Sequence, residues 1–221
     1  MNIKQSEYSI ETSIDGNEIM KQIERVGRTC YKSENQITNS SADKFVRGLI
    51  KRGHEAMIEH NAITIRFTCD RGVSHEIVRH RVASFGQEST RYCNYAQDKF
   101  SNQISVIDIS NGIKLDLQMQ ELDFTAIYKI ISEWKSAMED AEHHYFKMLK
   151  LGSTPQIARS VLPNSLKTEI VVTMNVREWR HFFMLRASKF AHPQMRELAM
   201  PLLNDFKVLM PAAFDDITPE V

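Results

Sequence analysis

Two short stretches in which apolar and polar residues alternate most constrain the fold of this chain. In the first, Ala62 to Thr68, the apolar positions are Ile63, Ile65 and Phe67. The second runs from Leu166 to Met174 and ends in the same alternation. Because successive side chains of a strand point to opposite faces, each stretch predicts a strand with one buried face. The apolar faces of the resulting sheet need other elements to cover them.

Amphipathic segments supply that cover. Apolar residues three and four positions apart, with Ser, Asp or Pro before them and Gly or Pro after them, are typical of helices. The predicted helices are Asn17 to Tyr31, a segment from Ser40 or Ser41 to Gly53, Gly72 to Arg81, Leu115 to Leu151 with a possible interruption, Pro155 to Leu162, Asn175 to Arg186, and Pro193 to Met210. A short strand is also expected within 102–109. We therefore expect an α+β fold, with helices packed on a mainly antiparallel sheet.

Composition narrows the classes of protein. The chain has 28 Lys and Arg against 28 Asp and Glu, so its formal net charge is zero, which argues against a general nucleic-acid or membrane-surface role. No apolar run is long enough to span a membrane, and the start lacks a signal-peptide core. Cys30, Cys69 and Cys93 form no metal-binding or disulfide pattern and are expected to be reduced. No stretch of linker composition divides residues 1–221, so we expect a single domain. Because neither a membrane span nor a signal peptide is indicated, we expect the protein to be cytoplasmic.

The most distinctive stretch is basic and then polar. Arg79-His80-Arg81 is followed, past Gly86, by Ser89-Thr90-Arg91. Arginine binds phosphate bidentately, hydroxyls donate to the same oxygens, and glycine permits close backbone approach. The pattern indicates a site for a phosphorylated ligand. The alternative is a basic helix end followed by a polar surface turn, because cations suit the C-terminal end of a helix.

A second arginine stands where a core residue would be expected. Trp179, Phe183 and Arg186 share one face of the predicted helix 175–186. A guanidinium keeps its charge, so burying it without a partner would cost several kcal/mol. Arg186 thus needs an anionic or carbonyl partner, either a ligand or a core-facing carboxylate such as Glu76. Arg180, towards the other side, is expected mainly on the surface.

A metal-dependent hydrolase is a weaker alternative. His54, Glu59 and His60 suggest a metalloprotease, but such sites need histidines one helical turn apart and these are six residues apart. No metal is therefore expected.

Ordered blocks of the sequence resemble the flavin-dependent thymidylate synthases. The blocks are Gly53-His54-Glu55 with Glu59-His60, Arg79-His80-Arg81 with Ser89, Ala158-Arg159 with Leu162-Pro163, Asn175 with Arg177, and Leu185-Arg186. The resemblance implies methylation of dUMP to dTMP, with methylenetetrahydrofolate as the carbon donor and hydride carried by FAD from NAD(P)H. It also implies a homotetramer with shared active sites, small-molecule substrates, and neither nucleic-acid nor membrane partners.

The resemblance also implies roles for individual residues. FAD would be held by Ala56, Arg79, His80, Arg81, Gln87, Asn175 and His181. The nucleotide would be held by Glu76, Arg79, Gln87, Glu88, Ser89, Thr90, Arg91, Arg159 and Arg186. His54 would line the folate side. Arg186 would be catalytic, favouring the uracil that has lost its N3 proton.

Some positions depart from the family pattern. Gly86-Gln87 stands where many members show Asn-Glu, Ala56 where a Ser or Thr is frequent, and His181 where some have Asn. Attack by Ser89 or Cys93 is chemically possible, but the resemblance assigns activation to the flavin hydride and Arg186. The remaining alternative is a non-catalytic nucleotide- or RNA-binding module that uses the same arginines.

Overall fold

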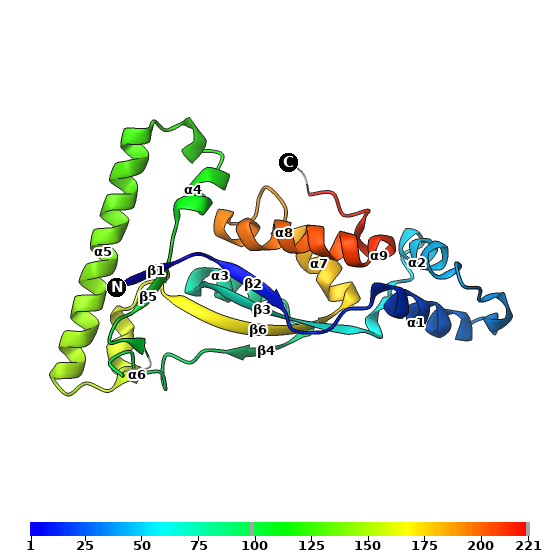
Figure 1. The fold of residues 1–221 in the computed structure, drawn as a ribbon, viewed down its shortest axis with the longest axis horizontal. Helices are drawn as coiled ribbons and strands as arrows, with labels where there is room; N and C mark the ends of the chain where they lie inside the picture. Colours follow the sequence, from blue (N-terminus) through cyan, green and yellow to red (C-terminus); the bar gives the residue numbers. More distant parts are fainter. Residues whose placement is uncertain (98–99, 220–221) are drawn as a thin grey trace. The chain divides into compact units, whose positions relative to one another are not determined.

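The computed structural model describes residues 1–97 and 100–219 and shows a mixed fold of helices and strands (Figure 1). The strands are β1 Asn2–Lys4, β2 Glu7–Ile10, β3 Ala62–Asp70, β4 Ala83–Gln87, β5 Ser105–Ile107 and β6 Lys167–Asn175. Four of them form a sheet in the order β2-β3-β6-β4, and β1 pairs with β5. The predicted α+β class with a mainly antiparallel sheet is confirmed.

Most helices agree with the predicted segments in order and approximate extent, whereas α9 and all of α4 except Leu115 lie outside those segments. They are α1 Gly16–Thr29, α2 Ala42–Lys51, α3 Arg71–Ile77, α4 Ser110–Leu115, α5 Phe124–Lys150, α6 Pro155–Ala158, α7 Val176–Arg186, α8 Pro193–Leu209 and α9 Pro211–Phe214. Short 3-10 turns are η1 Glu34–Gln36, η2 Glu55–Glu59, η4 Met119–Glu121 and η5 Arg159–Val161. Among the residues described, no helix is long and apolar enough to cross a membrane.

The chain divides into two compact units, each assembled from separate segments. The first unit comprises Met1–Glu7, Phe67–Arg79 and Gly86–Val171, and the second comprises Tyr8–Arg66, His80–Phe85 and Val172–Val221. The boundary falls within β2, β3, β4 and β6. That residues 1–221 act as one domain stays a prediction.

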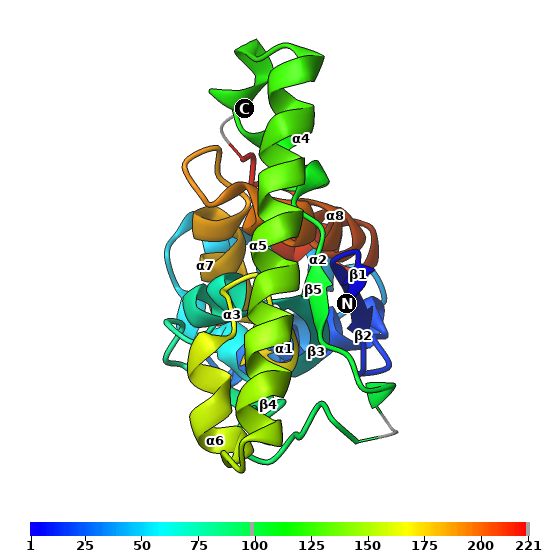
Figure 2. The same cartoon turned by 90° about the vertical axis from the view of Figure 1, so that its left-hand side faces the viewer.

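In the first unit, β1 and β5 pair in parallel, with Ile3 opposite Val106. The long helix α5 packs on α6 and η5, and Figure 2 shows α6 beside the end of α5. The apolar cluster of the first unit contains Tyr95, Ile104, Val106, Met138, Tyr145, Ala158 and Leu166. Burial of these side chains is the main force that holds α5 against the rest of this unit.

The predicted aromatic face of α7 forms the core of the second unit. Trp179, Phe182 and Phe183 are fully buried, and the rings of Trp179 and Phe183 pack against Phe206 of α8. The indole nitrogen of Trp179 donates to the carbonyl of Ile63 in β3 at 3.1 Å, which satisfies its only polar group inside the core. This packing fixes the rotation of α7 about its axis, and with it the direction of every other side chain on the helix.

One predicted helix boundary is wrong. Asp70 caps α3 as expected, accepting from the Val73 amide, but α3 ends at Ile77, four residues before Arg81. The amide of Arg79 donates to the carbonyl of Glu76, three residues before it, and this bond closes the last turn. Arg79, His80 and Arg81 thus lie beyond the helix and not in its last turn. The possible interruption of the predicted Leu115–Leu151 helix is confirmed, because Asp123 caps a new helix start by accepting from the Ala126 amide.

The prediction that Arg180 lies mainly on the surface is also wrong. Its side chain is only 4% exposed. The guanidinium forms two hydrogen bonds of 2.7 Å to the Asp216 carboxylate and a third to the carbonyl of Ala213. This bidentate pair holds Asp216 of the C-terminal segment against α7.

Candidate active site

In the second unit, the side chains of Glu178, His80 and Arg186 form a continuous hydrogen-bonded chain. His80 and Arg186 are predicted site residues, and Glu178 is not. The Nδ1 atom of His80 lies 2.9 Å from the carboxylate of Glu178, and its Nε2 atom lies 3.2 Å from Nε of Arg186. His80 is almost fully buried, and its ring packs against Phe182 at 5.1 Å between centroids. Arg186 is partly buried at the C-terminal end of α7. The predicted need of Arg186 for a polar partner is met in part by His80.

The electrostatic setting of His80 favours its neutral form. Burial lowers the pKa of the His80 imidazole most strongly, and the charges of Arg186 and His181 lower it further, whereas the hydrogen bond to Glu178 raises it. The net direction of the pKa is downward. A neutral imidazole has one donor and one acceptor nitrogen, as a chain between a carboxylate and a guanidinium requires.

The other predicted residues of the second unit lie on or near the same helix. Asn175 caps α7 by accepting from the Glu178 amide at 2.8 Å. His181 is exposed, and its ring meets that of His80 edge to face at 5.5 Å. The turn η2, which contains Ala56 and is preceded by His54, packs on α7. Arg81 is exposed.

The same cluster contains residue types that bind metals. Ligand-type atoms of His80, Glu178 and His181 lie within 4.8 Å of one another. Both nitrogens of His80 already take part in hydrogen bonds, so the arrangement is a hydrogen-bonded chain in this state. Within the described part of the chain, His54, Glu59 and His60 do not form such a group, and Glu59 instead pairs with Arg177 at 2.6 Å. Nothing therefore favours the hydrolase.

In the first unit, the structure brings Thr90 and Arg159 together. Nη1 of Arg159 donates to the Thr90 hydroxyl at 3.0 Å, and Thr90 is buried. Both residues line a cavity of about 440 Å³ that Arg71 and His75 also line. The cavity thus carries two guanidinium groups and a hydroxyl, a donor set that matches a phosphate.

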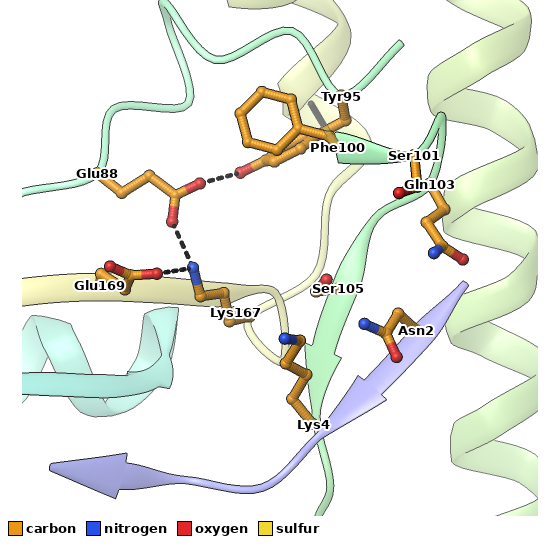
Figure 3. A pocket seen from close by; sticks show the side chains of 10 residues that line it. All are labelled: Asn2, Lys4, Glu88, Tyr95, Phe100, Ser101, Gln103, Ser105, Lys167 and Glu169. Carbon is orange, nitrogen blue, oxygen red and sulfur yellow. Dashed lines mark hydrogen bonds and ion pairs between the residues drawn. The ribbon is translucent and has the colours of Figure 1, made fainter. Parts of the chain in front are cut away.

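Gln87 and Glu88 make contacts within the first unit. The Gln87 amide donates to the hydroxyls of Ser74 at 2.9 Å and Thr168 at 3.3 Å. Figure 3 shows that the Glu88 carboxylate accepts from the Tyr95 hydroxyl and pairs with Lys167 at 3.1 Å. Burial and the Glu88 hydrogen bond raise the pKa of Tyr95. These contacts hold the side chains of Gln87 and Glu88 in place at the end of β4 and the start of the loop that follows it.

The rest of the predicted nucleotide set lies on that loop, on α3 and on the segment between α3 and β4. Arg79 and Arg91 are exposed, and within residues 1–97 and 100–219 neither shows an ion pair with a carboxylate. The Ser89 hydroxyl accepts from the Arg91 amide at 3.3 Å, so the loop turns back on itself there. Glu76 lies in the last turn of α3. Exposed guanidinium groups on an ordered loop are suited to bind an anion.

Comparison with known proteins places this geometry in a family. The family model for thymidylate synthase complementing protein matches residues 14–212. A flavin-dependent thymidylate synthase of Mycobacteroides abscessus is 32% identical over 208 residues, covering 93% of this chain and 81% of that protein. One from Pyrococcus furiosus is 32% identical over 194 residues, covering 87% and 72%.

The chain belongs to the flavin-dependent thymidylate synthases. The predicted family resemblance is thereby confirmed. The fold agrees with that of a crystal structure of a UMP/dUMP methylase, PolB from Streptomyces cacaoi, bound with 5-Br dUMP. That structure superposes with a TM-score of 0.80 at 21% identity and covers 97% of this chain and 96% of its own. The individual site residues stay predictions.

Sequence reasoning missed Glu178 in this flavin-dependent thymidylate synthase. The residue stands three positions after Asn175, where a glutamate is typical of a helix start. The sequence pattern therefore accounts for Glu178 as a helix-start residue and does not indicate its contact with His80. The signal that could have found it is its place on α7, two turns before Arg186. Its partner His80 lies 98 residues away in sequence, which no local pattern reveals.

Proposed function

We propose that this flavin-dependent thymidylate synthase methylates C5 of the uracil ring of dUMP, giving dTMP. The observation that carries the proposal is the family match over residues 14–212. That range contains both the Thr90–Arg159 pair of the first unit and the Glu178–His80–Arg186 chain of the second. In the reaction, the C5 hydrogen leaves as a proton, and a methyl group replaces it.

The residues present fit FAD. Its diphosphate is an anion, and Arg79 and Arg81 are exposed cations that show no ion pair in the described part of the chain. The rings of His80 and His181, whose centroids are 5.5 Å apart, add flat surface for an aromatic cofactor. These four residues, with Asn175 and the backbone at Ala56, would hold FAD. When bound in its reduced form, FAD supplies the hydride that completes the methyl group.

The nucleotide phosphate is assigned to the first unit. Arg159 and Thr90 line one cavity. Ser89 and Arg91 flank Thr90 on the loop that follows β4. An arginine fork binds phosphate oxygens at two points, which fixes orientation as well as affinity. Holding the phosphate in this way positions the uracil ring, and correct positioning alone lowers the barrier of a reaction between bound molecules.

Arg186 is assigned to the uracil ring. An arginine guanidinium carries a permanent positive charge that is spread over a planar group. Placed at N3 and the neighbouring carbonyl oxygen, it favours the ring that has lost its N3 proton. The negative charge spreads to C5, which makes that carbon a better nucleophile. A fixed cation facing developing charge is among the larger contributions that enzymes use.

The finer parts of the proposal concern the other substrates and the assembly. Methylenetetrahydrofolate would give the carbon, NADPH would restore the reduced flavin, and His54 would line the folate side. The active enzyme would be a cytoplasmic homotetramer whose subunits share active sites. Family membership supports all of these parts.

A visible absorption spectrum tests the proposal against its alternatives. The purified protein, incubated with FAD and freed of excess, should be yellow, and NADPH should bleach its oxidised-flavin bands. A colourless protein that takes up no FAD would contradict the synthase. A nucleotide- or RNA-binding module would behave in that way, and bound zinc would point to the hydrolase.

A further inference from the structure

We propose that Glu178 is a positioning residue that holds His80 in one tautomer, so that His80 can accept a hydrogen bond from Arg186 and orient its guanidinium. The inference rests on the proposed role of Arg186 at the uracil ring. It assigns a task to Glu178, a residue outside the sets proposed above to hold the nucleotide and FAD. The task is local to the second unit and can be measured without the reaction.

The tautomer follows from the geometry. An arginine Nε can only donate a hydrogen bond, so the His80 Nε2 atom that lies 3.2 Å from it must be the acceptor. The proton of a neutral His80 then sits on Nδ1, which is 2.9 Å from the Glu178 carboxylate and donates to it. Which nitrogen carries the proton is set by the hydrogen bond that the other side of the ring makes.

The surroundings leave the ring little freedom. The side chains of His80 and Glu178 are only 2% and 12% exposed. Phe182 packs on the imidazole at 5.1 Å and His181 at 5.5 Å between ring centroids. The backbone of Glu178 is fixed in turn, because its amide donates to the capping Asn175.

The spacing along α7 explains why a ring lies between the two charged groups. Glu178 and Arg186 are eight residues apart, about 12 Å along a helix. The imidazole closes this gap and connects the carboxylate to the guanidinium through a neutral group. The guanidinium is oriented by a hydrogen bond to that neutral ring.

The opposite tautomer would break the chain. With the proton on Nε2, two donors would face each other between His80 and Arg186, and the Glu178 carboxylate would lose its donor. A small displacement of a group that positions the reacting atoms is enough to lower a rate by a factor of 10 to about 100.

Three variants separate this role from simpler ones. Glu178→Ala removes the acceptor, whereas Glu178→Gln removes the charge and keeps an acceptor oxygen. The matched control is Glu18→Ala. Glu18 holds the equivalent first-turn position of α1, where its amide donates to the capping Asp15 at 3.0 Å, and its side chain is exposed. A helix-dipole role would be lost equally in Glu178→Ala and Glu178→Gln, since it depends on charge.

Two measurements are made on the full chain. Nitrogen-15 NMR of labelled histidine, with the His80 signals assigned by their absence in His80→Asn, reads the tautomer without substrate. The rate of dTMP formation, normalised to bound flavin, gives kcat/KM for dUMP. A wild-type chain that makes no dTMP would contradict the proposed function, while the NMR result would still decide the tautomer.

The proposal expects the Nδ1–H tautomer in the wild type, in Glu18→Ala and in Glu178→Gln, and its loss in Glu178→Ala. The value of kcat/KM should fall about 10-fold or more in Glu178→Ala and stay close to wild type in the other two. An Nε2–H tautomer in the wild type would overturn the proposal, as would a Glu178→Gln enzyme as impaired as Glu178→Ala. If Glu178→Ala does not fold, the wild-type tautomer and the Glu178→Gln rate remain decisive.

Discussion

Replacing Arg186 with Ala tests the proposed chemistry at its centre. The guanidinium donates to His80 at 3.2 Å and is assigned to the uracil ring. The substitution removes a charge that faces the developing negative charge on N3 and the ring carbonyl. It leaves the buried aromatic side chains of α7 in place, so the fold should survive.

The expected magnitude is worked from two of the interactions that the substitution removes, the proposed contact with the uracil ring and the hydrogen bond to His80. Removing one donor that faces a developing oxyanion costs about 3 to 4 kcal/mol, or about 10²- to 10³-fold in rate. The effect on stability is smaller, because the hydrogen bond to His80 inside the protein is worth about 1 kcal/mol and Arg186 is only partly buried. Activity should therefore collapse while the melting temperature changes little.

The assay measures dTMP formation, dUMP affinity and bound flavin on the same preparation. Arg186→Ala should retain FAD, bind dUMP more weakly and lose nearly all activity. Arg47→Ala is the matched control, since Arg47 is an exposed arginine of the same unit in a surface ion pair with Asp215. Full activity in Arg186→Ala, or an equal loss in Arg47→Ala, would refute the reasoning.

Three further predictions concern other parts of the molecule. Arg159→Ala should raise the KM for dUMP about 10-fold or more while FAD stays bound, because a charge-assisted bond to phosphate is worth about 1.5 to 3 kcal/mol; an unchanged KM would remove Arg159 from the phosphate site. Asp216→Asn should lower the unfolding free energy at neutral pH by about 1 to 2 kcal/mol, since Asp216 is half exposed. The hydrogen bond from Arg180 lowers the pKa of Asp216, so this contribution is present above the usual carboxyl pKa and lost as the pH falls through the lowered pKa; denaturation curves that differ equally at neutral and strongly acidic pH would contradict it. Cys93→Ser should leave dTMP formation largely intact, and its loss in a folded, FAD-bound variant would indicate a covalent role for the thiol.

The fold could be predicted where local pattern and burial agree. The alternation of Ile63, Ile65 and Phe67 predicted a strand whose apolar residues are all buried, and the aromatic spacing on α7 predicted the core of the second unit. Both are properties of short sequence windows. The ends of helices were harder to predict. Helix α3 ends where the backbone amide of Arg79 donates to the carbonyl of Glu76, and the residue types in this segment do not indicate that bond.

The candidate site was predictable in its residue types and not in its connections. Arg186 could be singled out because a permanent charge on an apolar face needs a partner. That His80 is this partner, and that Glu178 stands behind it, depends on segments about one hundred residues apart. Arg180 was misassigned for the same reason, since its partner Asp216 lies 36 residues further along the chain.

The most direct test of the whole account is the formation of dTMP from dUMP, methylenetetrahydrofolate, FAD and NADPH by the purified chain. We predict that dTMP appears with all four components, and that omitting methylenetetrahydrofolate or withholding both FAD and NADPH abolishes it. A folded, FAD-bound protein that produces no dTMP in the complete mixture would contradict the account.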